Sequence, residues 1–145
     1  MRLVLQRITS AQVTVDGQVV GRAGPGLCVF LAVGKDDGER QADDLAEKVL
    51  HLRVFEDSEG KMNRSVSDAK GDLLIVSEFT LYGDCTKGRR PSFTQAAAPA
   101  EAKRLCDYFI GRLKGSGLKV ATGRFQAKMD VALTNDGPVT FILEG

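Results

Sequence analysis

The run Leu27-Cys28-Val29-Phe30-Leu31-Ala32-Val33 is apolar at every position. A strand with one solvated face carries a polar residue at about every second position, so an unbroken run is typical of a strand covered on both faces. The glycine-rich segment Gly21–Gly26 precedes it and marks a turn between strands. The run therefore predicts the central strand of a sheet, and the neighbouring segments are interpreted around it.

The segment before this strand predicts a hairpin. Leu3–Val15 is a long strand candidate that alternates clearly at Gln12–Val15. Asp16-Gly17 is strong turn chemistry, and Gln18–Arg22 returns from it.

Two helices are expected after the central strand. Asp36 and Glu39 resemble a capping box at the start of the first helix. The second begins near Pro99, a favourable first-turn residue, and ends at Gly115 and Gly117. Apolar residues recur at spacings of three and four on one face of each helix. These residues are Ala42, Leu45, Val49 and Leu52 in the first helix, and Ala102, Leu105, Cys106, Phe109 and Leu113 in the second.

The remaining segments complete a single domain over residues 1–145. A polar, hairpin-like segment, Asp57–Lys70, leads into Leu73–Val76, a second continuous apolar strand that runs into Ser77–Leu81. Two helices among about seven strands predict an α+β domain whose sheet is largely antiparallel and barrel-like, with both helices packed on it. Val120, Met129–Leu133 and Val139–Leu143 supply the closing strands.

Composition limits the class of protein. No apolar run approaches the roughly 18 residues of a membrane span, and MRLVLQRITS lacks the long apolar stretch of a signal peptide. We therefore expect a cytoplasmic protein without a membrane partner. Cys28, Cys85 and Cys106 have no paired spacing, which argues against a disulfide framework and against a CxxC site.

The net charge of +1 conceals an uneven distribution. Residues 36–47 hold six acidic residues against one arginine, whereas residues 81–130 hold ten Lys and Arg against four acidic residues. Two interpretations of this uneven charge distribution stay open. The charged residues either form ordinary solvated faces, or those of the second half form a surface that binds phosphates.

The set of catalytic side chains is small. His51, the only histidine, lies within the first helix and is interpreted as a surface or packing residue, which disfavours Ser-His-Asp, Cys-His and zinc sites. No GxxxxGK[ST] phosphate loop is present, and Gly21–Gly26 is interpreted as a plain connection. Three segments remain as site candidates: Ser77–Thr80 at a strand end, the loop Gly83–Phe93, and Gly137-Pro138.

Each of these segments has two interpretations. Thr80 is a weak nucleophile without an adjacent base, whereas fixed backbone amides stabilise an oxyanion by roughly 3 to 4 kcal/mol per donor. Lys87, Arg89 and Arg90 either bind phosphate or are ordinary solvated charges. Gly137-Pro138 is either a turn into a last strand or backbone shaped for a ligand.

The same segments carry a family resemblance. Ser77-Glu78-Phe79-Thr80-Leu81 and Asn135-Asp136-Gly137-Pro138-Val139-Thr140 resemble the two signature motifs of the D-aminoacyl-tRNA deacylase family. Each fragment alone is weak, but together, in this order and spacing, they are specific. Further similar fragments are Met1–Arg7, Phe55–Asp57 with Met62-Asn63, Lys87–Phe93 and Gly123–Met129.

The resemblance implies a homodimer of barrel-like subunits that hydrolyses the ester between a D-amino acid, or glycine, and tRNA, a chiral proofreading reaction without a cofactor or metal. It places Ser77, Glu78, Phe79 and Thr80 at the catalytic pocket, with Thr80 near the ester. In the family the Gly-Pro peptide is cis and enters the partner subunit's pocket as the chiral selector, a role that falls here to Gly137 and Pro138.

Four further positions follow by resemblance. Arg7 braces the Gly-Pro turn, Phe125 and Met129 meet the terminal adenosine, and Ala102 flanks the pocket. A strand-surface charge for Arg7 and core packing for Phe125 and Met129 remain alternatives. One position departs from the family, which has glutamine where this chain has Glu78. If only the backbone acts there, the change is mild, which is the interpretation we favour; a side-chain contact would alter binding or pH dependence.

Two functions from other classes stay open. A non-catalytic RNA-binding module would use the basic second half for salt-sensitive tRNA affinity without deacylation. An amidase or esterase of small molecules would use Thr80 as nucleophile and survive loss of the basic loop.

Overall fold

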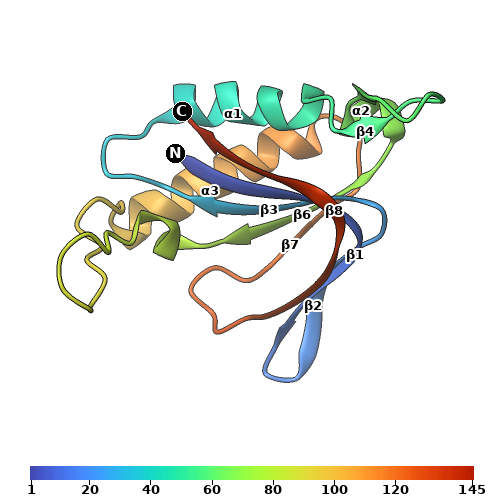
Figure 1. Cartoon of the computed structure of the whole chain (residues 1–145). Helices are drawn as coiled ribbons and strands as arrows, with labels where there is room; N and C mark the ends of the chain where they lie inside the picture. The colour runs from blue at the N-terminus through green and yellow to red at the C-terminus, as the bar shows by residue number, and fades with distance from the viewer.

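Strand β3 (Gly26–Ala32) is the centre of the sheet, as its unbroken apolar run predicts (Figure 1). In this computed structural model, which describes residues 1–145, β3 pairs antiparallel with β1 (Arg2–Val15) and parallel with β6 (Asp72–Ser77). Six of its seven residues are buried. Both faces of β3 are covered, which is why no polar alternation is needed.

The sheet has six strands in the order β2-β1-β3-β6-β7, with β8 paired to β1. The new strands are β2 (Gln18–Ala23), β7 (Val120–Thr122) and β8 (Asp130–Glu144). One edge of β1 pairs first with β3 and then with β2, so its other edge is free to pair with β8 along nearly its whole length. The predicted hairpin of β1 and β2 is confirmed, with positive φ at Asp16 and Gly17 in the turn.

The α+β class and the barrel-like sheet are confirmed, and the sheet is mixed. β7 lies parallel to β6, as β6 does to β3, because a helix connects each pair of strands. Gly21 of β2 lies so close to β7 that a Cβ there would be 2.4 Å from the Thr122 carbonyl oxygen. This contact brings the two ends of the sheet together and nearly closes the barrel.

Helices α1 (Glu39–His51) and α3 (Pro99–Lys114) cover one face of the sheet (Figure 1). The start at Pro99 is confirmed, but the capping box expected from Asp36 and Glu39 is wrong. Gly38 is the N-cap of α1, and its amide donates to Gln41 Oε1 at 3.0 Å. None of the helices is long and apolar enough to span a bilayer.

The polar segment Asp57–Lys70 is only partly the expected hairpin. It holds the end of the small hairpin β4 (Phe55–Glu56) and β5 (Met62–Arg64), and then the short helix α2 (Val66–Ala69). Ser65 caps α2 reciprocally with Asp68, since each side chain accepts from the other residue's amide, at 2.9 and 3.1 Å.

The closing segments are also more continuous than expected. The expected segment Met129–Leu133, except Met129 itself, and the segment Val139–Leu143 belong to the one strand β8, and Gly137-Pro138 lies at an irregularity in its pairing with β1 near Arg7. Two apolar clusters pack on the sheet. The first joins it to α1 and α3; the second fills the barrel with Ile8, Ala11, Val13, Val15, Ala23, Cys28, Leu74 and Val76.

Candidate active site

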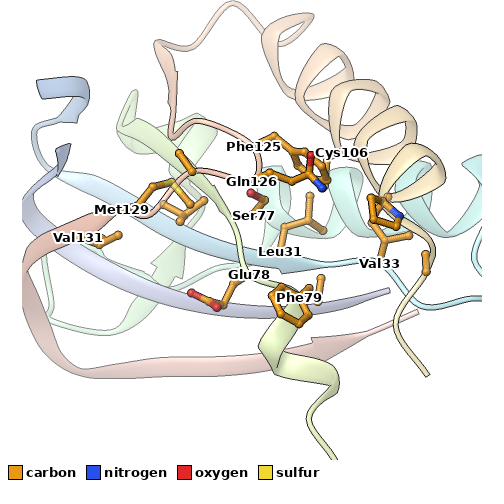
Figure 2. A pocket seen from close by; sticks show the side chains of 16 residues that line it. Leu31, Val33, Ser77, Glu78, Phe79, Cys106, Phe125, Gln126, Met129 and Val131 are labelled. Carbon is orange, nitrogen blue, oxygen red and sulfur yellow. The ribbon is translucent and has the colours of Figure 1, made fainter. Parts of the chain in front are cut away.

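A cavity of about 610 Å³ opens where β3 and β6 end, between α3 and the loop that leads into β8 (Figure 2). Twelve of its sixteen lining residues are hydrophobic. The cavity lies between the two apolar clusters and takes walls from both, so most of its surface is apolar. Its lining includes Leu31, Val33, Val76, Ala97, Cys106, Gln126, Ala127 and Val131.

Six residues predicted for the site line this cavity. They come from three places in the chain: the end of β6, helix α3 and the loop before β8 (Figure 2). The two wall residues from the loop, Phe125 and Met129, also pack against the apolar clusters, so the core-packing interpretation is confirmed and their contact with the terminal adenosine stays a prediction. The six residues are Ser77, Glu78, Phe79, Ala102, Phe125 and Met129.

The chain turns sharply as it leaves β6. Glu78 donates its amide to the Leu31 carbonyl at 2.8 Å, and a single turn of 3₁₀ helix, η1 (Phe79–Tyr82), follows. Neither the Phe79 nor the Thr80 amide donates a hydrogen bond within the chain. Two unused N–H donors therefore stand next to an apolar cavity.

Thr80 lies outside the cavity lining and is exposed. Its hydroxyl donates to Glu78 Oε1. Glu78 is the only charged residue that lines the cavity, and no cation forms an ion pair with it. The side chains at this end of the site thus supply the Glu78 carboxylate, which is bonded to the Thr80 hydroxyl, and a second hydroxyl from Ser77, which lines the cavity.

Other nucleophiles and bases are absent from the cavity or inactive in it. Burial raises the pKa of the Cys106 thiol to about 12, so the thiol is neutral near pH 7 and a poor nucleophile. His51 is exposed on α1, where its Nε2 lies 3.2 Å from Glu47 Oε1. No group of three His, Cys, Asp or Glu side chains is arranged to hold a metal ion.

Gly137 and Pro138 are joined by a cis peptide bond, as the resemblance implied. Both residues are exposed on β8 and neither lines the cavity of its own subunit. The Asn135 side-chain amide donates to the Arg7 carbonyl at 2.9 Å and to the Val139 carbonyl at 3.1 Å. These two hydrogen bonds therefore connect the turn to strand β1, and they connect the residues on either side of Gly137-Pro138 to each other.

Arg7 is buried behind this turn, with 6% of its surface exposed. Its Nη1 donates to the Val54 carbonyl at 2.7 Å, and its Nε lies 2.8 Å from Asp136 Oδ2 without the alignment of a hydrogen bond. A buried guanidinium held between a carbonyl and a carboxylate is not a strand-surface charge. It fixes the residue directly before Gly137.

Lys87, Arg89 and Arg90 lie together in the loop between η1 and α3. Mutual backbone hydrogen bonds of 2.8 and 3.0 Å between Asp84 and Ser92 close this loop at its base. All three basic side chains are exposed, and none forms an ion pair. Their charge is available to an external anion.

Sequence reasoning missed several parts of the site. The apolar walls Leu31 and Val33 cannot be told from core residues by type or spacing. Gln126 lines the cavity and has a left-handed backbone conformation, φ 60°, which the residues next to it in the sequence do not predict. Phe93 was noted only as part of a motif, yet its ring meets that of Phe79 edge to face, with centroids 5.0 Å apart.

Comparison with known proteins gives consistent matches over the whole chain. A family model described as D-Tyr-tRNA(Tyr) deacylase matches residues 4–144. A D-aminoacyl-tRNA deacylase of Heliobacterium modesticaldum is 59% identical over 145 residues, which are 100% of this chain and 97% of the relative. A D-aminoacyl-tRNA deacylase of Desulfotalea psychrophila is 59% identical over 144 residues, 99% of this chain and 97% of the relative.

Two solved structures share the fold. One, named c-Myc DNA Unwinding Element Binding Protein, has a TM-score of 0.94 and 38% identity, and the match covers 100% of this chain and 99% of that one. The other, described as a probable eukaryotic D-amino acid tRNA deacylase, has a TM-score of 0.88 and 21% identity, covering 98% of this chain and 97% of that one.

Proposed function

This chain belongs to the D-Tyr-tRNA(Tyr) deacylase family and is a hydrolase of aminoacyl-tRNA, and from that premise we propose how it works. The cavity at the end of β6 takes the ester of a D-amino acid, or of glycine, at the 3′ end of tRNA. Main-chain amides hold the oxyanion, and Gly137-Pro138 of a second subunit rejects L-amino acids. The two free amides of Phe79 and Thr80, next to a cavity whose only charged lining residue is Glu78, carry this proposal.

The ester bond needs little help from side chains. Attack on its carbonyl carbon develops negative charge on oxygen, and fixed N–H donors in a dry site stabilise that charge without reorganising. The Phe79 and Thr80 amides are such donors, since neither has an acceptor in the chain. Water attacks the carbonyl carbon and the bond to the ribose oxygen breaks, which releases the free amino acid and the ribose hydroxyl; the neighbouring 2′-hydroxyl of the tRNA takes the place of a side chain in positioning that water. Glu78 acts mainly through its backbone position.

Selection of the D-form follows from steric exclusion by the selector, Gly137 and Pro138. Gly137 has no side chain, so its backbone can approach the substrate Cα closely. The side chain of an L-residue would point into that backbone, whereas that of a D-residue points away from it. Glycine has no side chain to exclude and is therefore cleaved. Arg7 and Asn135 support this role because they hold the turn in one place.

A homodimer is required because the selector is exposed and does not line its own cavity. β8 pairs with β1 alone, so its second edge has no partner within the subunit. Phe141 and Ile142 on β8, 38% and 69% exposed, provide apolar surface beyond the selector. An unpaired strand edge with exposed apolar side chains favours association with a second copy.

The decisive experiment compares D-tyrosyl-tRNA with L-tyrosyl-tRNA. We expect release of D-tyrosine and none of L-tyrosine above the rate without protein. Cleavage of both substrates would show that Gly137-Pro138 does not select between D- and L-amino acids. Salt-sensitive tRNA binding with cleavage of neither would favour the non-catalytic RNA-binding module instead.

Thr80→Ala is expected to lower kcat/KM for D-tyrosyl-tRNA by less than about tenfold, because the backbone amide that it retains does the work. Thr80→Ser is the matched variant that keeps the hydroxyl. Single-turnover deacylation measures both variants. A folded Thr80→Ala protein with activity reduced 1,000-fold or more, on the order expected for a lost nucleophile, would restore Thr80 to that role.

Replacement of Lys87, Arg89 and Arg90 together by alanine is expected to weaken tRNA binding and to reduce the slope of log K against log salt by about 2 to 3 units. Each free cation that meets a phosphate releases a counterion, which makes binding salt-dependent. The control removes Arg40, Lys61 and Lys103, which pair with neighbouring carboxylates. An equal change of slope in the control would show that net charge alone matters.

A further inference from the structure

Two aromatic rings stand exposed at the mouth of the cavity. Phe79 lines the cavity and is still 58% exposed, and Phe93 beside it is 37% exposed. Their interplanar angle is 63° at a centroid distance of 5.0 Å, an edge-to-face pair. Each ring contacts the other and still keeps part of its surface open to solvent.

The position of Phe93 is fixed by the loop that carries the free cations. Its ring packs on Gly83, where a Cβ would lie 3.2 Å from Phe93 Cε1, and Phe93 directly follows the Asp84–Ser92 closure. Lys87, Arg89 and Arg90 stand within that closed loop and have no carboxylate partners. Exposed aromatic surface and cations without ion pairs therefore lie within one short segment, residues 87–93, whose Phe93 contacts the cavity residue Phe79.

We propose that Phe93, supported by Phe79, is a stacking platform for an unpaired base of the tRNA 3′ strand, next to the nucleotide that carries the amino acid. The inference rests on the proposed function, which brings that nucleotide to the cavity. Proteins that hold single strands combine a basic track for the backbone with aromatic rings for the bases. Stacking on a ring reads no sequence, which suits a 3′ end shared by many tRNAs.

The charge of the loop favours this occupant over a protein partner. An apolar patch buried in a protein interface is depleted in charge at its centre, whereas Phe93 ends a loop whose three cations, Lys87, Arg89 and Arg90, form no ion pair. A polyanion that also presents flat apolar faces satisfies both features at once, and unpaired nucleic acid is such a ligand.

The test compares two substrates of the same chemistry. D-tyrosyl-tRNA carries the upstream unpaired bases, and the D-tyrosyl ester of adenosine lacks them. We expect Phe93→Ala to lower the ratio of kcat/KM for the tRNA to kcat/KM for the adenosine ester by about tenfold, through KM on the tRNA. Phe93→Trp should keep the wild-type ratio, and Phe93→Leu, which is apolar but not flat, should behave as alanine does.

Other outcomes overturn the inference. An unchanged ratio in Phe93→Ala, or a wild-type ratio in Phe93→Leu, shows that a flat ring is not needed. A loss of dimer in Phe93→Ala by light scattering, with equal loss on both substrates, assigns the pair to contact between subunits. Wild-type protein that cleaves neither ester defeats the proposed function itself, whereas the first two outcomes leave wild-type deacylation intact.

Discussion

Ala102→Phe is expected to lower kcat/KM for D-tyrosyl-tRNA by at least about 100-fold while the protein stays folded. Ala102 is half-buried on α3 and lines the cavity. A benzyl group at this position fills space that the aminoacyl group needs, and displacement of the ester by even 1 Å from the oxyanion donors costs on the order of 100-fold.

Ala100→Phe is the matched control, since Ala100 lies on the same helix but is exposed and does not line the cavity. It should retain wild-type kcat/KM and the same thermal midpoint. Steady-state deacylation and thermal unfolding measure both variants. Full activity in a folded Ala102→Phe protein would mean that the aminoacyl group binds elsewhere.

Gly137→Ala is expected to cause a loss of similar size, about 100-fold, without loss of stability. Within the subunit the added methyl would meet only Asn135 Oδ1, at 3.3 Å, a contact that a small shift of the amide relieves. In the dimer that we propose, the methyl would stand where the substrate Cα must approach, so the substrate would be held away from the amides. Gly111→Ala, whose Cβ has no neighbour within 4 Å, is the control and should remain active.

These two variants also test whether the selector acts across the dimer. Ala102→Phe blocks a cavity and leaves its Gly137 intact, whereas Gly137→Ala spoils the selector and leaves its cavity open. If the selector enters the partner's cavity, each mixed dimer has one complete site, and random mixing restores about a quarter of wild-type activity. No recovery in mixed dimers, identified by two affinity tags, would mean that selector and cavity belong to one subunit.

The sequence predicts the parts of the fold that depend on burial. The unbroken run of β3 and the apolar faces of α1 and α3 are visible because their side chains must be excluded from water. The polar contacts that cap the helices are harder to predict from the sequence. Gly38 caps α1 through the side chain of Gln41, and α2 was overlooked although Ser65 and Asp68 have capping-box spacing.

The residues of the candidate site also differ in how far the sequence alone predicts them. Ser77 and Glu78 are recognisable because polar residues at the end of a buried strand are unusual. Ala102, Phe125 and Met129 are available only through family resemblance, since small and apolar residues that line a cavity have the same pattern as those that fill a core. Continuity of β8 through Gly137-Pro138 depends on pairing with β1, a long-range partner that no local pattern of turn residues reveals.

The ties around Asn135 have a consequence for how discrimination is achieved. Asn135 is bonded to carbonyls on two sides of its turn, and the neighbouring Arg7 is anchored to Val54. A wedge held in this way moves only together with the strands behind it. If Gly137-Pro138 acts as the selector we propose, it therefore discriminates between aminoacyl groups by shape alone, because an L-aminoacyl group cannot displace it.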